Sequence, residues 1–198
     1  MNFKSAIPGN LSYNILEEGL YFIKMIMSVI LIYIIYNSKL KFDELNKPIN
    51  ISVLLVSLSI VVLNILKLSY SSYGFETISA NVFSWFTDHN YDCFSLASKG
   101  YFEMANQVVA LLLLYLPIIV YFYLKKFKLL NVITLILTII ASLMLGTRLS
   151  SYGSLLELIY LILLYLFFVI LKKEKINYLR FIILVVLTLS IVFLIRYS

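Results

Sequence analysis

Six apolar runs limit what this chain can fold into. They cover residues 20–36, 51–68, 107–124, 129–145, 154–171 and 181–195. Each is close to the roughly 20 residues that an α-helix needs to cross a hydrocarbon core, and none shows the apolar-polar alternation of a transmembrane β-barrel. The sequence therefore predicts an all-α fold, a polytopic transmembrane helical bundle of about six spans that forms a single domain over residues 1–198. We expect a multi-pass integral protein of a cell membrane.

Composition supports insertion into a membrane and argues against other partners. Hydrophobic residues make up 62% of the chain and charged residues 13%, whereas soluble domains are about half apolar and a quarter charged. The net charge of +6 would suggest nucleic acid in a soluble protein, but here the cations lie in short loops, where they orient helices. The lipid bilayer is therefore the expected partner, and nucleic acid is not. One histidine and one cysteine, His89 and Cys93, give no spaced set of metal ligands, so we expect neither a metal nor another cofactor.

Positive charge alternates between successive connections. Ten lysines and arginines lie in three of them, residues 37–50, 125–128 and 172–180. The positive-inside rule places these three connections in the cytoplasm. The N-terminus, residues 69–106, Arg148 and the C-terminal Arg196 are then expected at the outer face.

Residues 69–106, which we call the aromatic segment, form the longest connection and are unusually rich in large apolar side chains. These are Tyr70, Tyr73, Phe75, Val82, Phe83, Trp85, Phe86, Tyr91, Phe94, Tyr101 and Phe102. Aromatic residues favour the headgroup level, so the segment is expected to lie along the membrane surface or partly re-enter it, with a short interfacial helix over residues 75–86. Aromatic faces also stack on sugar rings, and that alternative stays open.

A short polar break, residues 144–153, separates the fourth and fifth runs and carries a single charge, Arg148. A cation with apolar sequence close on both sides must reach the membrane interface or meet an anion, because unpaired burial is costly. Two interpretations stay open. Arg148 either anchors a helix end at the interface or binds an anionic group at the outer face.

A second polar group stands at the expected outer mouth of the third span. Asn106 and Gln107 are predicted to cap and open this helix, so their side chains lie where backbone N–H groups favour anions. Lys99 adds a cation close by. The simpler alternative is capping together with a lysine that reaches the interface. No classical enzyme motif is present, so no catalytic residue is named.

Three short motifs follow one another along the chain. They are Tyr70-Ser71-Ser72-Tyr73-Gly74, then Gly100-Tyr101-Phe102 with Ala105-Asn106-Gln107, then Leu145-Gly146-Thr147-Arg148. From about residue 70 to the C-terminus, the chain resembles the O-antigen ligase/polymerase family. The resemblance implies a GT-C-like membrane glycosyltransferase that moves a glycan from a polyprenyl-diphosphate donor to an acceptor at the outer face. It also implies that Arg148 occupies the first of the arginine positions thought to hold the diphosphate, and Arg196 the start of a large outer loop.

The chain departs from the family pattern in three respects. Tyr101 stands where the family usually has Trp, and Gln107 stands where Glu is frequent. Family members are usually much longer, so we expect this chain to be a partial GT-C-like bundle that stops where the large outer loop would begin. A second chain that supplies the missing C-terminal half is then an expected partner.

These observations predict a partial O-antigen ligase/polymerase-like glycosyltransferase of cell-surface polysaccharide biosynthesis, acting on polyprenyl-diphosphate-linked glycans. Whether the chain is an enzyme by itself is left open. Two alternatives remain: a non-catalytic fragment or assembly partner, and a transporter of lipid-linked glycans. A transporter requires polar residues deep in several spans, whereas Asn64 is the main mid-helix amide and the other polar side chains look scattered.

Overall fold

The computed structural model describes residues 41–87, 96–172 and 177–197, together with isolated positions between 19 and 38. The side chains of residues 85, 86, 172 and 194–197 are not described. The chain divides into two units, Met1–Leu45 and Asn46–Ser198, and each is described by itself. The single domain over residues 1–198 stays a prediction.

The first unit contains the predicted span over residues 20–36, most of which lies outside the described residues. The positions that are described between 19 and 37 are helical and exposed. Near its end this unit has one turn of 3₁₀ helix, η2 (Phe42–Leu45).

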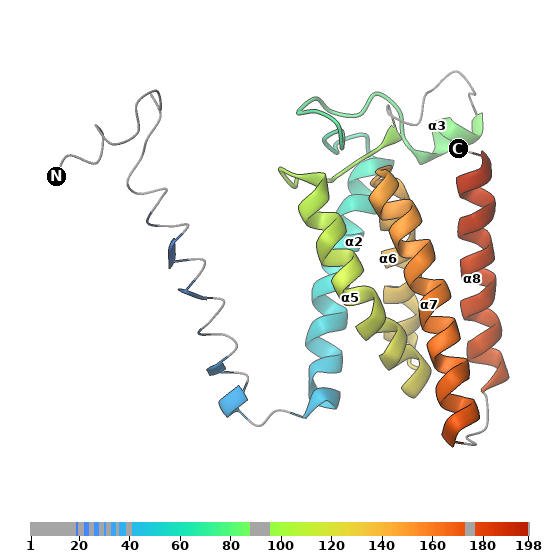
Figure 1. Ribbon diagram of the computed structural model, residues 1–198. Helices are drawn as coiled ribbons and strands as arrows, with labels where there is room; N and C mark the ends of the chain where they lie inside the picture. Colours follow the sequence, from blue (N-terminus) through green and yellow to red (C-terminus); the bar gives the residue numbers. More distant parts are fainter. Residues whose placement is uncertain are drawn as a thin grey trace. The chain divides into compact units, whose positions relative to one another are not determined.

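The second unit is a bundle of α-helices (Figure 1). Its elements are α2 (Asn46–Ile65), α3 (Val82–Thr87), α5 (Ala105–Lys125), α6 (Leu129–Met144), α7 (Arg148–Lys172) and α8 (Tyr178–Tyr197). The five long helices stand side by side, and α3 lies with irregular chain at one end of the bundle (Figure 1). The predicted all-α helical bundle is therefore confirmed.

Three stretches in the described part of the chain are long and apolar enough to cross a membrane. They are Phe42–Ile65, Ala105–Lys125 and Arg148–Leu171, and shorter apolar helices cover Leu129–Met144 and Tyr178–Phe193. The protein is thus a multi-pass integral membrane protein. The number of six spans stays a prediction, because the first span lies mostly outside the described residues.

Successive helices alternate in direction, so their connections gather at two opposite ends (Figure 1). One end carries the turn between α5 and α6 with Lys126 and Lys128, and the start of α8 with Arg180. We call this the lysine end. The other end, the aromatic end, carries the aromatic segment, the turn between α6 and α7, and the end of α8. This arrangement separates the two sets of connections as the charge pattern predicted, while their assignment to the cytoplasm and the outer face stays a prediction.

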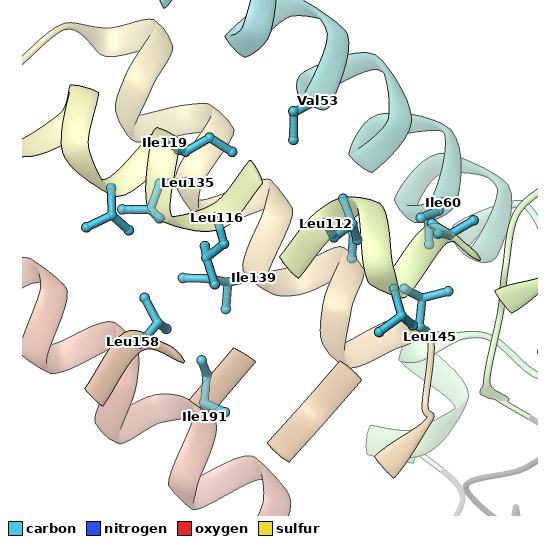
Figure 2. Packing of buried hydrophobic residues seen from close by; sticks show 14 of the residues in the cluster. Val53, Ile60, Leu112, Leu116, Ile119, Leu135, Ile139, Leu145, Leu158 and Ile191 are labelled. Atoms are coloured by element: carbon cyan, nitrogen blue, oxygen red, sulfur yellow. The ribbon is translucent and has the colours of Figure 1, made fainter. Parts of the chain in front are cut away.

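Apolar side chains from every long helix of the second unit fill its centre. Those labelled in Figure 2 are Val53, Ile60, Leu112, Leu116, Ile119, Leu135, Ile139, Leu145, Leu158 and Ile191, each at most 4% exposed. The helices are also apolar on their outward faces, where side chains such as Leu114 and Ile170 are exposed. Helices that are hydrophobic on all sides suit a lipid environment.

A row of buried polar side chains runs along α6, where that helix packs against α2. It consists of Asn131, Thr134, Thr138 and Ser142. The hydroxyls of the last three donate to carbonyls one turn earlier in the same helix at 2.7–2.9 Å, and Ser57 of α2 reaches the Thr138 hydroxyl at 3.5 Å. Small polar residues of this kind let transmembrane helices approach closely. Our expectation of scattered polar residues is therefore wrong for α6, but these hydroxyls are used within the packing.

Candidate functional site

The break between α6 and α7 is shorter than the sequence suggested. α6 ends at Met144, and the helix resumes at Arg148 rather than after residue 153. The reason is a cap: the Thr147 hydroxyl accepts a bond from the Ser150 backbone N–H at 3.1 Å, and the Ser150 hydroxyl donates back to the Thr147 carbonyl at 2.8 Å. The turn itself is Leu145-Gly146-Thr147, with Gly146 at φ +64°. Arg148 is consequently the first residue of a 25-residue helix.

Arg148 is exposed, and its side chain makes no hydrogen bond or ion pair with the residues that the structure describes. The first turn of α7 contains no acidic residue. A cation at the positive end of a helix dipole is slightly unfavourable for the helix, whereas the free N–H groups there favour an anion. The placement of Arg148 thus contributes little to helix stability and is well suited to anion binding.

The aromatic segment folds back over this turn through backbone pairing. The Tyr70 N–H donates to the Gly100 carbonyl at 2.9 Å, and the Ser72 N–H donates to the Ala97 carbonyl at 3.0 Å. From the segment that pairs with these residues, the Ser98 N–H donates to the Met144 carbonyl at 2.8 Å, at the very end of α6. All three motifs of the family resemblance therefore meet at the aromatic end.

A side-chain bond completes the contact with the turn. The Tyr73 hydroxyl donates to the Gly146 carbonyl oxygen at 2.7 Å. On the same turn, Ala97 lies so close to Gly146 that a Cβ on the glycine would come within 2.5 Å of the alanine Cβ. Only glycine fits this position.

Asn64 fastens the aromatic segment to α2. Its amide nitrogen donates to the Leu96 carbonyl at 3.1 Å and to the Ser98 hydroxyl at 3.0 Å, and its oxygen accepts the Val82 N–H at 2.9 Å. The side chain is 1% exposed. Our placement of Asn64 in the middle of a span is therefore wrong: α2 ends at Ile65, and Asn64 is a buried anchor in its last turn. It does not contribute to a polar path through the bundle.

The helix expected over residues 75–86 is also shorter than predicted. α3 begins at Val82, after Asn81, whose side-chain oxygen accepts the Ser84 N–H at 3.0 Å as a cap. The preceding residues form bends and irregular chain instead, and Thr77 makes an isolated antiparallel bridge with Tyr70. Whether the segment lies on a membrane surface stays a prediction.

Lys99 is not a freely projecting cation. It is 4% exposed, and its ammonium donates to the Gly74 carbonyl at 2.8 Å while lying 5.0 Å from the centroid of the Phe75 ring. The side chain therefore holds the turn that follows Tyr73. Its charge remains at the aromatic end, but one of its three donors is used inside the protein.

Asn106 and Gln107 lie in the first turn of α5 and do not cap it. The helix begins at Ala105, and Met104 occupies the cap position without a side-chain cap bond. Both amides are exposed, and the Gln107 amide nitrogen contacts the Met104 sulfur at 3.5 Å. α5 packs on α7 closely enough that a Cβ on Gly153 would lie 3.0 Å from Leu113. Two adjacent helices thus point their N-termini to the aromatic end, neither with an acidic residue in its first turn.

Comparison with known families agrees with this arrangement of motifs. The family described as O-antigen ligase like membrane protein matches residues 1–197. The chain belongs to this family. The match covers more of the chain than the resemblance from about residue 70 suggested. Neither the curated proteins nor the solved structures contained a match. Membership supports a role for this O-antigen ligase-like protein in polysaccharide biosynthesis at the membrane.

Two parts of the O-antigen ligase-like protein that the sequence analysis considered are not described in atomic detail. Arg196 lies in the last turn of α8, at the aromatic end, but its side chain is not described. The loop that contains His89 and Cys93 lies outside the described residues. Among the residues that are described, no group of three or more His, Cys, Asp or Glu could hold a metal ion.

Sequence reasoning overlooked Glu157, which interrupts the apolar run assigned to residues 154–171. It lies in α7 and is half-buried, and its Oε2 atom is enclosed without a hydrogen-bond partner among the described residues. An ionisable side chain within a membrane span is rare and costly unless it is paired. A search for acidic residues inside the six runs would have singled it out.

Proposed function

We propose that this O-antigen ligase-like protein binds the diphosphate of a polyprenyl-diphosphate-linked glycan at its aromatic end and takes part in glycosyl transfer from that donor. The observation that carries the proposal is Arg148, an exposed guanidinium at the N-terminus of α7 that has no partner among the described residues. A diphosphate is the anion that best matches both features, because a guanidinium and a helix N-terminus each favour phosphate oxygens.

The length of α6 supports a lipid-linked ligand. Its 16 residues span about 24 Å at 1.5 Å per residue, whereas a hydrocarbon core is about 30 Å thick. With Lys128 at one membrane surface, the Gly146 turn therefore lies a few ångströms below the other. The long side chain of Arg148 can then extend from that level to the phosphates of a membrane-bound donor, which lie just outside the hydrocarbon core. A water-soluble sugar nucleotide would be less well placed.

The other candidate residues have different parts in this proposal. Asn106 and Gln107 supply neutral donors from the first turn of α5, next to α7. Lys99 contributes positive potential from within the aromatic segment, since its ammonium is already bonded to Gly74. Arg196 would add a third cation from the end of α8.

In the transfer step, the bond between the anomeric carbon and the diphosphate oxygen breaks, and a bond from an acceptor hydroxyl to that carbon forms. The electron pair leaves with the diphosphate, whose charge Arg148 stabilises, and the hydroxyl proton passes to a base. No described residue is assigned as that base. Donor binding without transfer, as in an assembly partner, would use the same site. A second chain that completes the site stays a prediction.

The donor chemistry can be tested directly with the full chain in lipid nanodiscs. We would compare the dissociation constants of three short-chain prenyl glycans, joined through a diphosphate, a monophosphate or no phosphate. The proposal expects the diphosphate to bind at least about tenfold more tightly than the monophosphate, because hydrogen bonds to charged groups are worth about 1.5–3 kcal/mol each. Equal affinities would show that the chain recognises the prenyl group or the sugar instead.

A further inference from the structure

Tyr73 connects the aromatic segment to the α6–α7 turn across a long stretch of sequence. Its hydroxyl donates to the Gly146 carbonyl oxygen at 2.7 Å. The Gly146 carbonyl lies in the turn between α6 and α7, outside the hydrogen-bond pattern of either helix. The Tyr73 side chain is 53% exposed, so it contributes little to the buried core. Its hydroxyl forms a surface hydrogen bond between the aromatic segment and the turn.

The residues around Tyr73 are themselves held in place. On one side, the Ser72 N–H donates to the Ala97 carbonyl at 3.0 Å, and on the other, the Lys99 ammonium donates to the Gly74 carbonyl at 2.8 Å. Ala97 and Lys99 flank Ser98, whose backbone N–H donates to the Met144 carbonyl at 2.8 Å. The Tyr73 hydroxyl is therefore presented to Gly146 from a fixed backbone.

Arg148 follows Gly146 by two residues. The Thr147 cap fixes the α7 side of this short connection, and the Tyr73 bond and the Ala97 contact fix the Gly146 side. The guanidinium itself has no partner among the described residues. The backbone at Arg148 therefore sets the point and the direction from which this flexible side chain extends.

We infer that Tyr73 is a positioning residue, which acts through the Gly146 carbonyl to direct Arg148 toward the donor diphosphate. The inference rests on the proposed function for its consequence in binding. It assigns Tyr73 no contact with the donor. Loss of the hydroxyl should leave the fold intact while the turn and Arg148 sample more orientations.

The first test measures the turn without any ligand. Hydrogen exchange of the Gly146, Ser150 and Ser151 amides, whose N–H groups are bonded in and around the turn, would be compared in wild type, Tyr73→Phe and the control Tyr70→Phe. Tyr70 is a neighbouring tyrosine whose ring meets Tyr101 edge-on, and its hydroxyl makes no hydrogen bond within the described part of the chain. We expect several-fold faster exchange in Tyr73→Phe only, with an unchanged melting temperature. Equal exchange in all three proteins would overturn the inference.

The second test is a double-mutant cycle on the affinity for a short-chain prenyl-diphosphate glycan. Tyr73→Phe should weaken binding about three- to tenfold in the wild-type background and not at all in the Arg148→Ala background. Equal losses in both backgrounds would mean that Tyr73 affects binding independently of Arg148 and would overturn the positioning role, as would no loss in either. If Arg148→Ala alone leaves affinity unchanged, the proposed function fails, and the exchange measurement still decides whether Tyr73 orders the turn.

Discussion

Gly146 and Ala97 are packed so closely that a Cβ atom on the glycine would lie 2.5 Å from the Cβ atom of the alanine. Gly146 also has φ +64°, a conformation that other L residues adopt only with strain. The contact joins the aromatic segment to the α6–α7 turn, two residues before Arg148. The stability of this end of the bundle therefore depends on the absence of a side chain at residue 146.

Gly146→Ala should lower the free energy of unfolding in detergent by about 2–5 kcal/mol. About 1–2 kcal/mol of this comes from the left-handed backbone and about 1–3 kcal/mol from overpacking. Gly74→Ala is the matched control, since a Cβ there would meet nothing nearer than 3.9 Å. Combining Gly146→Ala with Ala97→Gly should recover part of the loss by removing the closest contact. If Gly146→Ala and Gly74→Ala have equal stability, the packing described here is contradicted.

Asn64→Leu should destabilise the protein by about 2–4 kcal/mol, because it leaves the Val82 N–H and the Leu96 carbonyl without their partner. Asn50→Leu is the comparison, since Asn50 is equally buried in α2 but its side chain bonds only to Asn46 of its own helix within the described part of the chain. We expect the second change to cost at most about 1 kcal/mol. Thermal unfolding of both variants measures the difference, and a larger loss for Asn50→Leu would refute the anchoring role of Asn64.

The bundle could be predicted from the sequence because the length of an apolar run indicates a helix that can cross a membrane. The placement of lysines indicates which connections share an end of the bundle. α6, for example, was expected over residues 129–145 and covers Leu129–Met144. The aromatic segment could not be predicted in the same way. Its fold depends on pairing between residues about 30 apart, such as Tyr70 with Gly100, and on contacts with Met144 and Gly146. No local pattern encodes those contacts.

Two candidate residues show the same limit at the site. The sequence correctly marked Arg148 as an isolated charge, but it did not reveal that Thr147 caps a helix and makes Arg148 its first residue. Lys99 was interpreted either as a cation beside an anion site or as a lysine that reaches the interface, and the structure buries it against Gly74 and Phe75. That contact depends on how the turn at residues 71–76 folds, which composition does not determine.

The orientation in the membrane follows from the charge bias and can be tested by labelling. In a background with Cys93→Ser, a membrane-impermeant maleimide applied from outside should modify Ser151→Cys and spare Phe127→Cys. The two positions lie at opposite ends of the bundle, in the first turn of α7 and in the turn after α5. The reverse labelling pattern would place Arg148 at the cytoplasmic face and remove the proposed outer site.

Glu157→Leu should raise the free energy of unfolding by about 1–3 kcal/mol, since the enclosed Oε2 atom lacks a partner among the described residues. Glu157→Gln keeps the size but remains polar, so its gain should be smaller. Donor affinity should not change, because Glu157 lies nine residues from Arg148, about 13 Å along the helix axis. A loss of stability in Glu157→Leu would show instead that the carboxyl group has a partner.

The most direct measurement of the central claim is the affinity of a short-chain prenyl-diphosphate glycan for wild type, Arg148→Lys and Arg148→Ala in nanodiscs. Arg148→Ala should weaken binding about 30-fold or more, corresponding to at least about 2 kcal/mol, without lowering the melting temperature of the unliganded protein. Arg148→Lys should fall between the two, because an ammonium cannot donate the paired hydrogen bonds of a guanidinium. Lys128→Ala, which removes an exposed cation at the lysine end, should bind like wild type. Equal affinities across all four proteins would contradict the diphosphate site.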